Sequence, residues 1–198
     1  MNGELLFESD QKRTDMNDFL SEIYNHLGID YRKFFKMDTL SKAGFVASEL
    51  LLKDFNREQA KEDMGIIFFN ESSSLKADKV YQQTIQEKDN YFPSPAVFVY
   101  TLPNIVAGEI AIRNKIHGET AFFLLPRFQF TLIEETVKGV FINSGMKDLL
   151  VGWIEVGNNE MDVCMMLCAT GEEGVIEFNS ENIENIYNKS LMGSSNNL

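Results

Sequence analysis

The sequence contains only two cysteines and two histidines, so few of its side chains could act as a nucleophile, a base or a soft metal ligand. Cys164 and Cys168 lie four positions apart inside an apolar run. A CxxxC pair without a CxxC partner is a weak signal for metal or redox chemistry. Buried thiols usually serve as small packing residues, and we favour that interpretation here. The pattern also favours His26 as a surface residue and His117 as a helix-terminal residue over a general base.

Acidic residues are abundant, but their spacing predicts no acid–base pair. Glu134 and Glu135 are adjacent, as are residues 172–173, and adjacent residues on a helix point apart. Glu160 and Asp162 flank an expected hairpin, where their polarity suits a turn better than a metal site. The sequence contains no P-loop, nucleotide-binding glycine pattern, Ser–His–Asp order or zinc-ligand spacing. We therefore expect neither a cofactor nor a metal.

The composition indicates one globular domain. The chain has 198 residues, of which 44% are hydrophobic, and this is enough to bury a core. A formal charge of −12 argues against nucleic acids and anionic membranes as partners. The apolar runs are too short to span a bilayer, and no basic-then-apolar leader opens the sequence. We expect a cytoplasmic protein with no membrane insertion, a single domain over residues 1–178, and a polar, partly disordered tail over 179–198.

The hydrophobic pattern predicts helices that alternate with strands. Helices are expected at 14–27, 39–55, 75–85, 105–116 and 130–143, with Asp38 and Asn104 as N-caps. Strands are expected at 65–69, 120–125, 149–156 and 161–169, and the last two form a hairpin. This order predicts a layered α/β fold with helices on both faces of a mixed sheet. Gly108 costs its helix about 1 kcal/mol, so close packing against a neighbour is expected there.

Several segments together resemble the N-terminal half of the β-ketoacyl-acyl carrier protein synthases, which belong to the thiolase-like superfamily. The matching segments are KMDTLS at 36–41, DMGII at 63–67, the loop at 92–95, TLPNIVAGEIA at 101–111, and LVGWIEV at 150–156. The best match is 101–111, which has the family's Asn, Ala-Gly and Ile-Ala spacing. Gly118, with the strand and helix expected after it, resembles the segment that flanks the family's catalytic cysteine. The resemblance covers about residues 36–157 and implies a thiolase-like half-fold.

The resemblance also implies that the family's catalytic residues are missing. When Gly118 is placed on the family glycine, Arg127 falls at or next to the position of the catalytic cysteine. A Claisen condensation needs a thiolate or an activated hydroxyl to hold the acyl chain. Arginine stays protonated in proteins and cannot do this. The family's histidines, or its histidine and asparagine, come from a second half that this sequence does not include.

The preferred interpretation is therefore a pseudoenzyme: a non-catalytic ketosynthase-like subunit, either chain-length-factor-like or an assembly partner, in fatty acid or polyketide-type biosynthesis. In the family, the strand before the nucleophile pairs with its mate across the dimer. The resemblance thus implies an interface at 119–125, with Glu119, Thr120, Phe122 and Leu124 as candidate contacts. The implied partner is a ketosynthase in a heterodimer or a second copy in a homodimer.

Arg127 would then have a structural role, pairing with a carboxylate such as Glu134 or with the partner. An acyl carrier protein is a further candidate partner. Carriers are acidic and would need a basic patch, although the overall negative charge counts against tight binding. The candidate basic clusters are Arg32, Lys33 and Lys36, and Arg113 with Lys115.

Two other functions remain open from the sequence. One is a condensing enzyme or acyltransferase that uses Thr131, Ser144 or Cys164 as its nucleophile, although neither hydroxyl has an evident base. The other is a small-molecule or acyl-chain-binding module. The aromatic residues of 122–130 are favoured as core or interface residues, and a lipid-lined acyl tunnel is the alternative. Covalent loading by an acyl thioester would separate the first function from the second.

Overall fold

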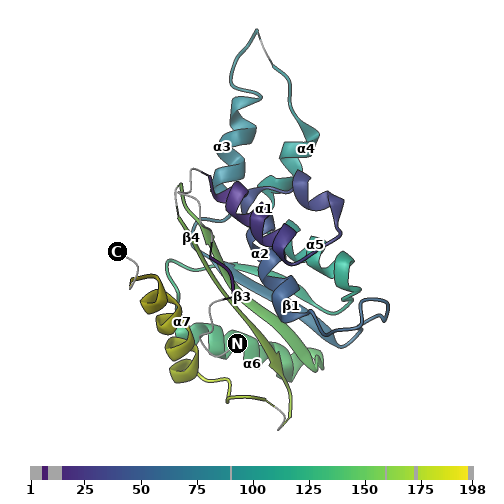
Figure 1. Cartoon of the computed structure of the whole chain (residues 1–198), viewed down its shortest axis with the longest axis vertical. Helices are drawn as coiled ribbons and strands as arrows, with labels where there is room; N and C mark the ends of the chain where they lie inside the picture. Colours follow the sequence, from purple (N-terminus) through teal and green to yellow (C-terminus); the bar gives the residue numbers. More distant parts are fainter. Residues whose placement is uncertain (1–5, 9–14, 90, 159, 172–173, 196–198) are drawn as a thin grey trace.

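The computed structural model describes residues 6–8, 15–89, 91–158, 160–171 and 174–195. Its centre is one sheet of four strands, in the order β2–β1–β3–β4 (Figure 1). The strands are β1 (Met64–Asn70), β2 (Thr120–Leu124), β3 (Asp148–Val156) and β4 (Met161–Ala169). β1 runs parallel to both β2 and β3, whereas β4 is antiparallel to β3. The prediction of a mixed α/β sheet is confirmed.

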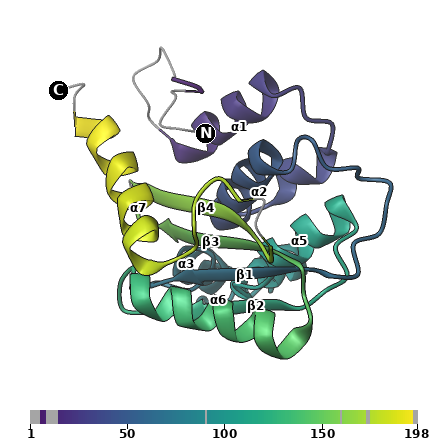
Figure 2. The same ribbon diagram turned by 90° about the horizontal axis from the view of Figure 1, so that it is seen from below.

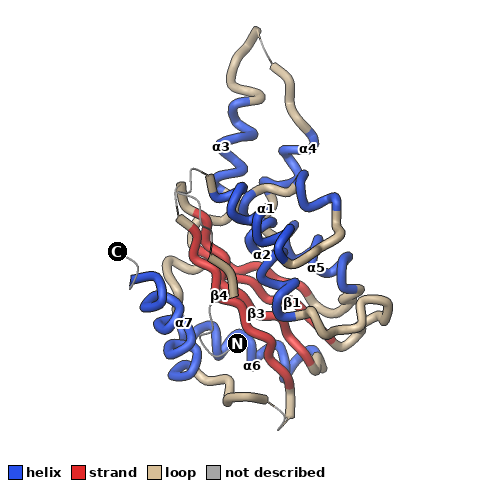
Figure 3. The backbone as a smooth tube through the Cα atoms, viewed as in Figure 1, coloured by secondary structure: helices blue, strands red, loops and turns tan. Residues whose placement is uncertain are grey.

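Helices cover both faces of this sheet, as the blue and red segments of Figure 3 show. On one face lie α1 (Met16–His26), α2 (Thr39–Leu51) and α5 (Ile105–Asn114). On the other face lie α6 (Phe130–Ser144) and α7 (Ser180–Ser195), as the view in Figure 2 makes clear. Alternate side chains of each strand therefore enter two different cores. In β1, Ile66 and Phe68 join the first core, and Ile67 and Phe69 join the second.

The connecting segments are short helices. They are η1 (Arg32–Lys36), α3 (Leu75–Gln83), α4 (Pro95–Phe98) and η2 (Val99–Thr101). α3 and α4 project beyond one end of the sheet (Figure 1). No single helix among the described residues has the length and apolarity to cross a bilayer, whereas the pair Pro95–Thr101 and Ile105–Asn114, bent by 98°, meets both criteria together.

α2 is the buried helix around which the first core forms. Ten of its thirteen residues are buried, and Asp38 caps its start because Oδ1 accepts from the Ser41 backbone N–H at 3.0 Å. The predicted cap is confirmed, but the helix ends four residues earlier than expected. A Cβ on Gly44 would lie 2.6 Å from Val106 Cγ2 and 2.8 Å from Ile154 Cδ1. The close approach expected at Gly108 is wrong, because nothing lies within 4 Å of its Cβ position.

The helix α7 was missed in the sequence, where residues 179–198 are expected to form a polar tail. Most of its residues are polar, but Ile183 is buried in the second core, and Ile186 and Tyr187 pack against that core. A single apolar stripe is enough to hold such a helix on a folded body. Residues 196–198 of the expected tail lie outside the described residues, and the limits of the domain stay a prediction.

Candidate functional site

β2 forms an open edge of the sheet, and the predicted interface residues lie along it. Within the described residues its inner side pairs with β1, and no strand pairs with its outer side. Thr120 and Leu124 are exposed, the latter to 56%, and the side chain of Glu119 is also exposed. An edge strand presents unpaired backbone N–H and C=O groups that can pair with another strand.

The hydrogen bonds of β2 show which of its backbone N–H and C=O groups are free to pair with another strand. The Glu119 carbonyl accepts from the Ile66 N–H at 2.8 Å, and the Leu125 N–H donates to the Asn70 carbonyl at 2.8 Å. Odd-numbered residues of this strand therefore face β1, because backbone groups alternate between the two sides of a strand. It follows that the outward-facing N–H and C=O groups belong to residues 120, 122 and 124.

The aromatic side chains of β2 pack on opposite faces of the sheet. Phe122 is half-buried and lies edge-on to Phe68, at 6.5 Å between ring centroids. Phe123, which the sequence analysis did not select, stacks on Phe69 at 5.5 Å and is 40% exposed. Phe123 and Leu124 are thus the apolar side chains that β2 leaves most open to a partner.

Arg127 lies in the loop between β2 and α6, directly after Pro126, and it is exposed. The expected pair with Glu134 does not form. The Glu134 carboxylate instead accepts from Lys138 Nζ and from the Ser180 backbone N–H, both at 2.6 Å. No other ion pair of Arg127 occurs among the described residues, so its guanidinium faces solvent where a carboxylate or phosphate could reach it.

The aromatic residues after Arg127 form a packed cluster. Phe128 lies 4.2 Å from Tyr187, 5.3 Å from Trp153 and 5.1 Å from Phe130, measured between ring centroids. The Tyr187 hydroxyl donates to Asp162 at the far side of this cluster. The Phe128–Phe130 segment therefore packs against the second core, as favoured from the sequence, and does not line a lipid tunnel.

The candidate nucleophiles of the enzyme interpretation are not activated. Both cysteines are buried, and burial raises the pKa of each thiol to about 12, with the nearby Asp162 charge adding to the effect at Cys164. Ser144 Oγ donates to the Val140 carbonyl at 2.6 Å, at the end of α6. Thr131 is exposed, and no histidine contacts it among the described residues.

The two histidines lie away from these groups. His117 Nδ1 is 2.8 Å from Glu62 Oε1, in the turn before β2. His26 packs its ring against Phe7 at 5.1 Å on the first helix. Neither forms a nucleophile–base pair with a hydroxyl or thiol in the residues that the structure describes.

We expect both thiols to be inert in the native chain. With a pKa near 12, only about one thiol in ten thousand is ionised at about pH 8. Neither iodoacetamide nor an acyl thioester should add mass to the native protein, while urea-unfolded chain should gain two carbamidomethyl groups. The measurement is intact-mass spectrometry. An acyl adduct on the native chain would revive the enzyme interpretation.

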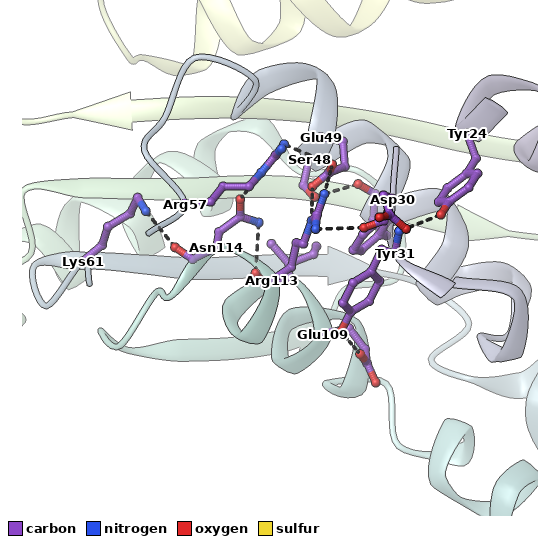
Figure 4. Close-up of polar contacts among 12 residues, drawn as sticks. Tyr24, Asp30, Tyr31, Ser48, Glu49, Arg57, Lys61, Glu109, Arg113 and Asn114 are labelled. Atoms are coloured by element: carbon purple, nitrogen blue, oxygen red, sulfur yellow. Dashed lines mark hydrogen bonds and ion pairs between the residues drawn. The ribbon is translucent and has the colours of Figure 1, made fainter. Parts of the chain in front are cut away.

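A buried ion-pair network joins α2 to α5 (Figure 4). The Glu49 carboxylate is buried and contacts two guanidinium groups: Arg57 Nη2 at 3.0 Å and Arg113 Nε at 3.4 Å. Arg57 Nε also donates to Asn114 Oδ1 at 3.3 Å, and Arg113 Nη1 donates to the Asp30 carbonyl at 3.1 Å. One carboxylate thus faces two guanidinium groups, and the other N–H groups of the arginines donate to neutral acceptors. The Glu49 charge is therefore fully paired, and we interpret the group as a structural network.

A second buried carboxylate, Glu109 of α5, holds η1 in place. It accepts from Lys33 Nζ at 2.6 Å and from the Tyr31 hydroxyl at 3.2 Å. The hydrogen bond to Glu109 raises the pKa of Lys33, and burial followed by the Glu109 charge raises the pKa of Tyr31. The Tyr24 hydroxyl in turn accepts from the Tyr31 backbone N–H at 2.7 Å.

These contacts engage most of the basic residues proposed for carrier binding. Lys33 pairs with Glu109 and Arg113 with Glu49, as described above, and Lys115 Nζ lies 2.9 Å from Glu58 Oε2. Arg32 and Lys36 remain exposed. The sequence could not reveal these pairings, because each joins residues more than fifty positions apart. The predicted basic patch is thus largely neutralised by its own chain.

Comparisons with known proteins identify the fold. No family model matches the sequence, and no curated protein matches it. The structure is similar to a chain of "The ishigamide ketosynthase/chain length factor", with a TM-score of 0.55 and 24% identity over 69% of this chain and 38% of that chain. It is also similar to a chain of the ketosynthase ApeO in complex with its chain length factor ApeC from Xenorhabdus doucetiae, with a TM-score of 0.55 and 11% identity over 81% of this chain and 73% of that chain.

The fold is therefore of the ketosynthase and chain length factor type, a thiolase-like half-fold. This chain spans little more than a third of the length of the first of those structures. The fold class implied by the sequence resemblance is confirmed.

Proposed function

We propose that this protein is a non-catalytic subunit that pairs with a ketosynthase in fatty acid or polyketide-type biosynthesis. The observation that carries the proposal is the end of β2, where Arg127 occupies the place that the resemblance gives to the nucleophile. The same strand is an open edge with two exposed apolar side chains, Phe123 and Leu124. A chain with a usable edge and no nucleophile beside it suits an assembly role.

The chemistry of the position supports this assignment. An acyl-enzyme intermediate needs a group that can be deprotonated and can form an ester or thioester. The Arg127 guanidinium stays protonated and does neither. It can instead bind a carboxylate or phosphate in a forked geometry, which suits a contact to a partner subunit.

The edge suits strand-to-strand association with a ketosynthase. The structural neighbours are ketosynthase and chain length factor assemblies, and we propose the same type of partner for this chain. The outward backbone groups of residues 120, 122 and 124 would pair with a strand of the partner. Phe123 and Leu124 would lose their solvent exposure on association.

The test is co-expression with a ketosynthase from the same organism, followed by native mass spectrometry. The native chain is expected to form a one-to-one complex. The double variant Thr120→Pro with Leu124→Pro removes two outward N–H groups without touching the bonds to β1, so it should weaken the complex at least about tenfold.

The matched control is Thr120→Ala with Leu124→Ala, which truncates the same side chains but keeps both N–H groups. This control should bind better than the proline variant. Equal binding by the native chain and the proline variant would rule out pairing through β2. A stable homodimer in the presence of the ketosynthase would replace the heterodimer with the second copy as partner.

A further inference from the structure

A pocket of about 370 Å³ is lined by residues of α1, the start of α2, α3 and α4. This is the size of a small-molecule site. Three lysines line it: Lys36, Lys42 and Lys76. The remaining wall is mostly apolar and includes Met37, Val80 and Val97. None of these residues belongs to β2 or to the loop that holds Arg127.

Lys42 is the unusual member of this set, because the residue is almost fully buried and no carboxylate of the described residues lies within ion-pair distance of its ammonium. Only 9% of the residue is exposed, and Nζ donates to Asn17 Oδ1 at 3.1 Å. The ammonium also lies 5.7 Å from the centre of the Phe34 ring. No carboxylate within the described residues forms an ion pair with it. Buried lysines are rare unless they are paired, since an uncompensated charge is costly to bury.

The residues that line the pocket include more cations than anions: three lysines and one aspartate. The lining carboxylate, Asp38, uses Oδ1 to cap α2 through the Ser41 N–H. Asp15 and Asp18 also lie near enough to favour the charged form of Lys42, and Asp15 Oδ1 is engaged by the Asn17 backbone N–H at 2.8 Å. Burial outweighs these three carboxylates and lowers the pKa of Lys42. Asp15 and Asp18 lie outside the pocket lining, so the lining itself has three lysines and one carboxylate on a chain of net charge −12.

The apolar wall determines what kind of anion would fit. Met37 is almost fully buried beneath the pocket, while Val80 of α3 is 47% exposed. An inorganic anion would leave this wall in contact with water, whereas an aliphatic chain would cover it. A site of this kind, with a few polar groups in an apolar wall, is typical for small organic ligands.

We propose that this pocket binds a small anion that carries a short apolar chain. The carboxylate or phosphate head contacts Lys42, with Lys36 and Lys76 adding attraction, and the chain lies against Met37, Val80 and Val97. The inference is independent of the proposed ketosynthase partner, because every group that it uses belongs to this chain. Failure of one would leave the other unaffected.

The test is isothermal titration calorimetry on the full chain with three probes: octanoate, octyl phosphate and octanol. Octanoate or octyl phosphate is expected to bind at least about tenfold more tightly than octanol, because only the anions can pair with Lys42. A preference for octyl phosphate would assign a phosphate ester as the head group, and a preference for octanoate would assign a carboxylate. Equal binding of octanol, or no binding of either anion, would overturn the proposal.

Lys42→Met should weaken binding of the preferred anion at least about tenfold, because it removes the charge and keeps the side-chain volume. Lys79→Met is the matched control: it removes an exposed lysine from the same helix as Lys76, outside the pocket, and should leave the affinity unchanged. The thermal unfolding midpoint of Lys42→Met should equal or exceed that of the native chain, since a buried charge is lost. An equal loss of affinity in both variants would show that only overall charge attracts the anion and would overturn the site.

Discussion

Replacing Arg57 and Arg113 together by methionine is expected to lower the free energy of unfolding by about 3–5 kcal/mol. The two guanidinium groups lie 3.0 and 3.4 Å from the Glu49 carboxylate. Glu49 lies on the buried helix α2 and is only 4% exposed, so water cannot replace both arginines. The double variant leaves a carboxylate in the core with no cation beside it.

The measurement is urea unfolding followed by circular dichroism, and a third substitution supplies the control. Adding Glu49→Met to the double variant removes the stranded charge and should recover most of the lost stability. This recovery separates the cost of an unpaired charge from the cost of lost side-chain packing. If the triple variant is no more stable than the double variant, the network has no electrostatic role.

Gly118→Ala is expected to cost about 3 kcal/mol, at the upper end of the usual range for overpacking. The Gly118 N–H donates to the Met64 carbonyl at 3.0 Å, where the chain enters β2. A Cβ at this position would lie 2.2 Å from that same carbonyl oxygen and 2.5 Å from Met146 Sδ. The methionine side chain can move, but the backbone of β1 is fixed between its two neighbours in the sheet.

Gly108→Ala is the matched control within helix α5, because nothing lies within 4 Å of its Cβ position. That variant should be neutral or more stable by about 0.5–1 kcal/mol, the usual gain in a helix interior. Both variants are measured by the same urea titration. If the Gly118→Ala variant is as stable as the native chain, β1 and the start of β2 can move apart at this point without a loss of stability.

The elements that the sequence predicted well are those with strong local patterns. α2 combines a short polar cap at Asp38 with apolar residues at helical spacing, and β1 is a continuous apolar run that suits a central strand. The hairpin between β3 and β4 carries its own turn residues. Each of these signals depends on neighbours in sequence, so no long-range contact was needed to find them.

The features that were missed depend on tertiary contacts. The helical spacing at Gly108 is the same whether or not another helix approaches it, and the close approach occurs at Gly44 instead. The partners of Glu49 and Glu109 lie on other elements, so the sequence alone did not show which cations pair with these two carboxylates. The pocket around Lys42 forms only when α1 and α3 meet the start of α2.

The open edge at β2 was predicted only through resemblance. Thr120 and Leu124 could be placed on a strand from composition, but no local pattern states whether that strand is central or at an edge. The strand order β2–β1–β3–β4 shows that β2 lies at an edge of the sheet. Phe123 was not among the candidate contacts Glu119, Thr120, Phe122 and Leu124, although a strand that adds at an edge contacts side chains on both faces.

The central place of β1 has a consequence for how the chain folds. β1 is complete by Asn70, yet one of its two partners, β3, begins only at Asp148. Such long-range pairing requires the closure of a large loop, and this closure costs conformational entropy before the hydrogen bonds between β1 and β3 can form. The pairing therefore slows folding. The Gly65–Phe69 run is therefore exposed on the ribosome until β3 has been synthesised. During that interval we expect this apolar run to be prone to aggregation and to be a segment that a chaperone binds.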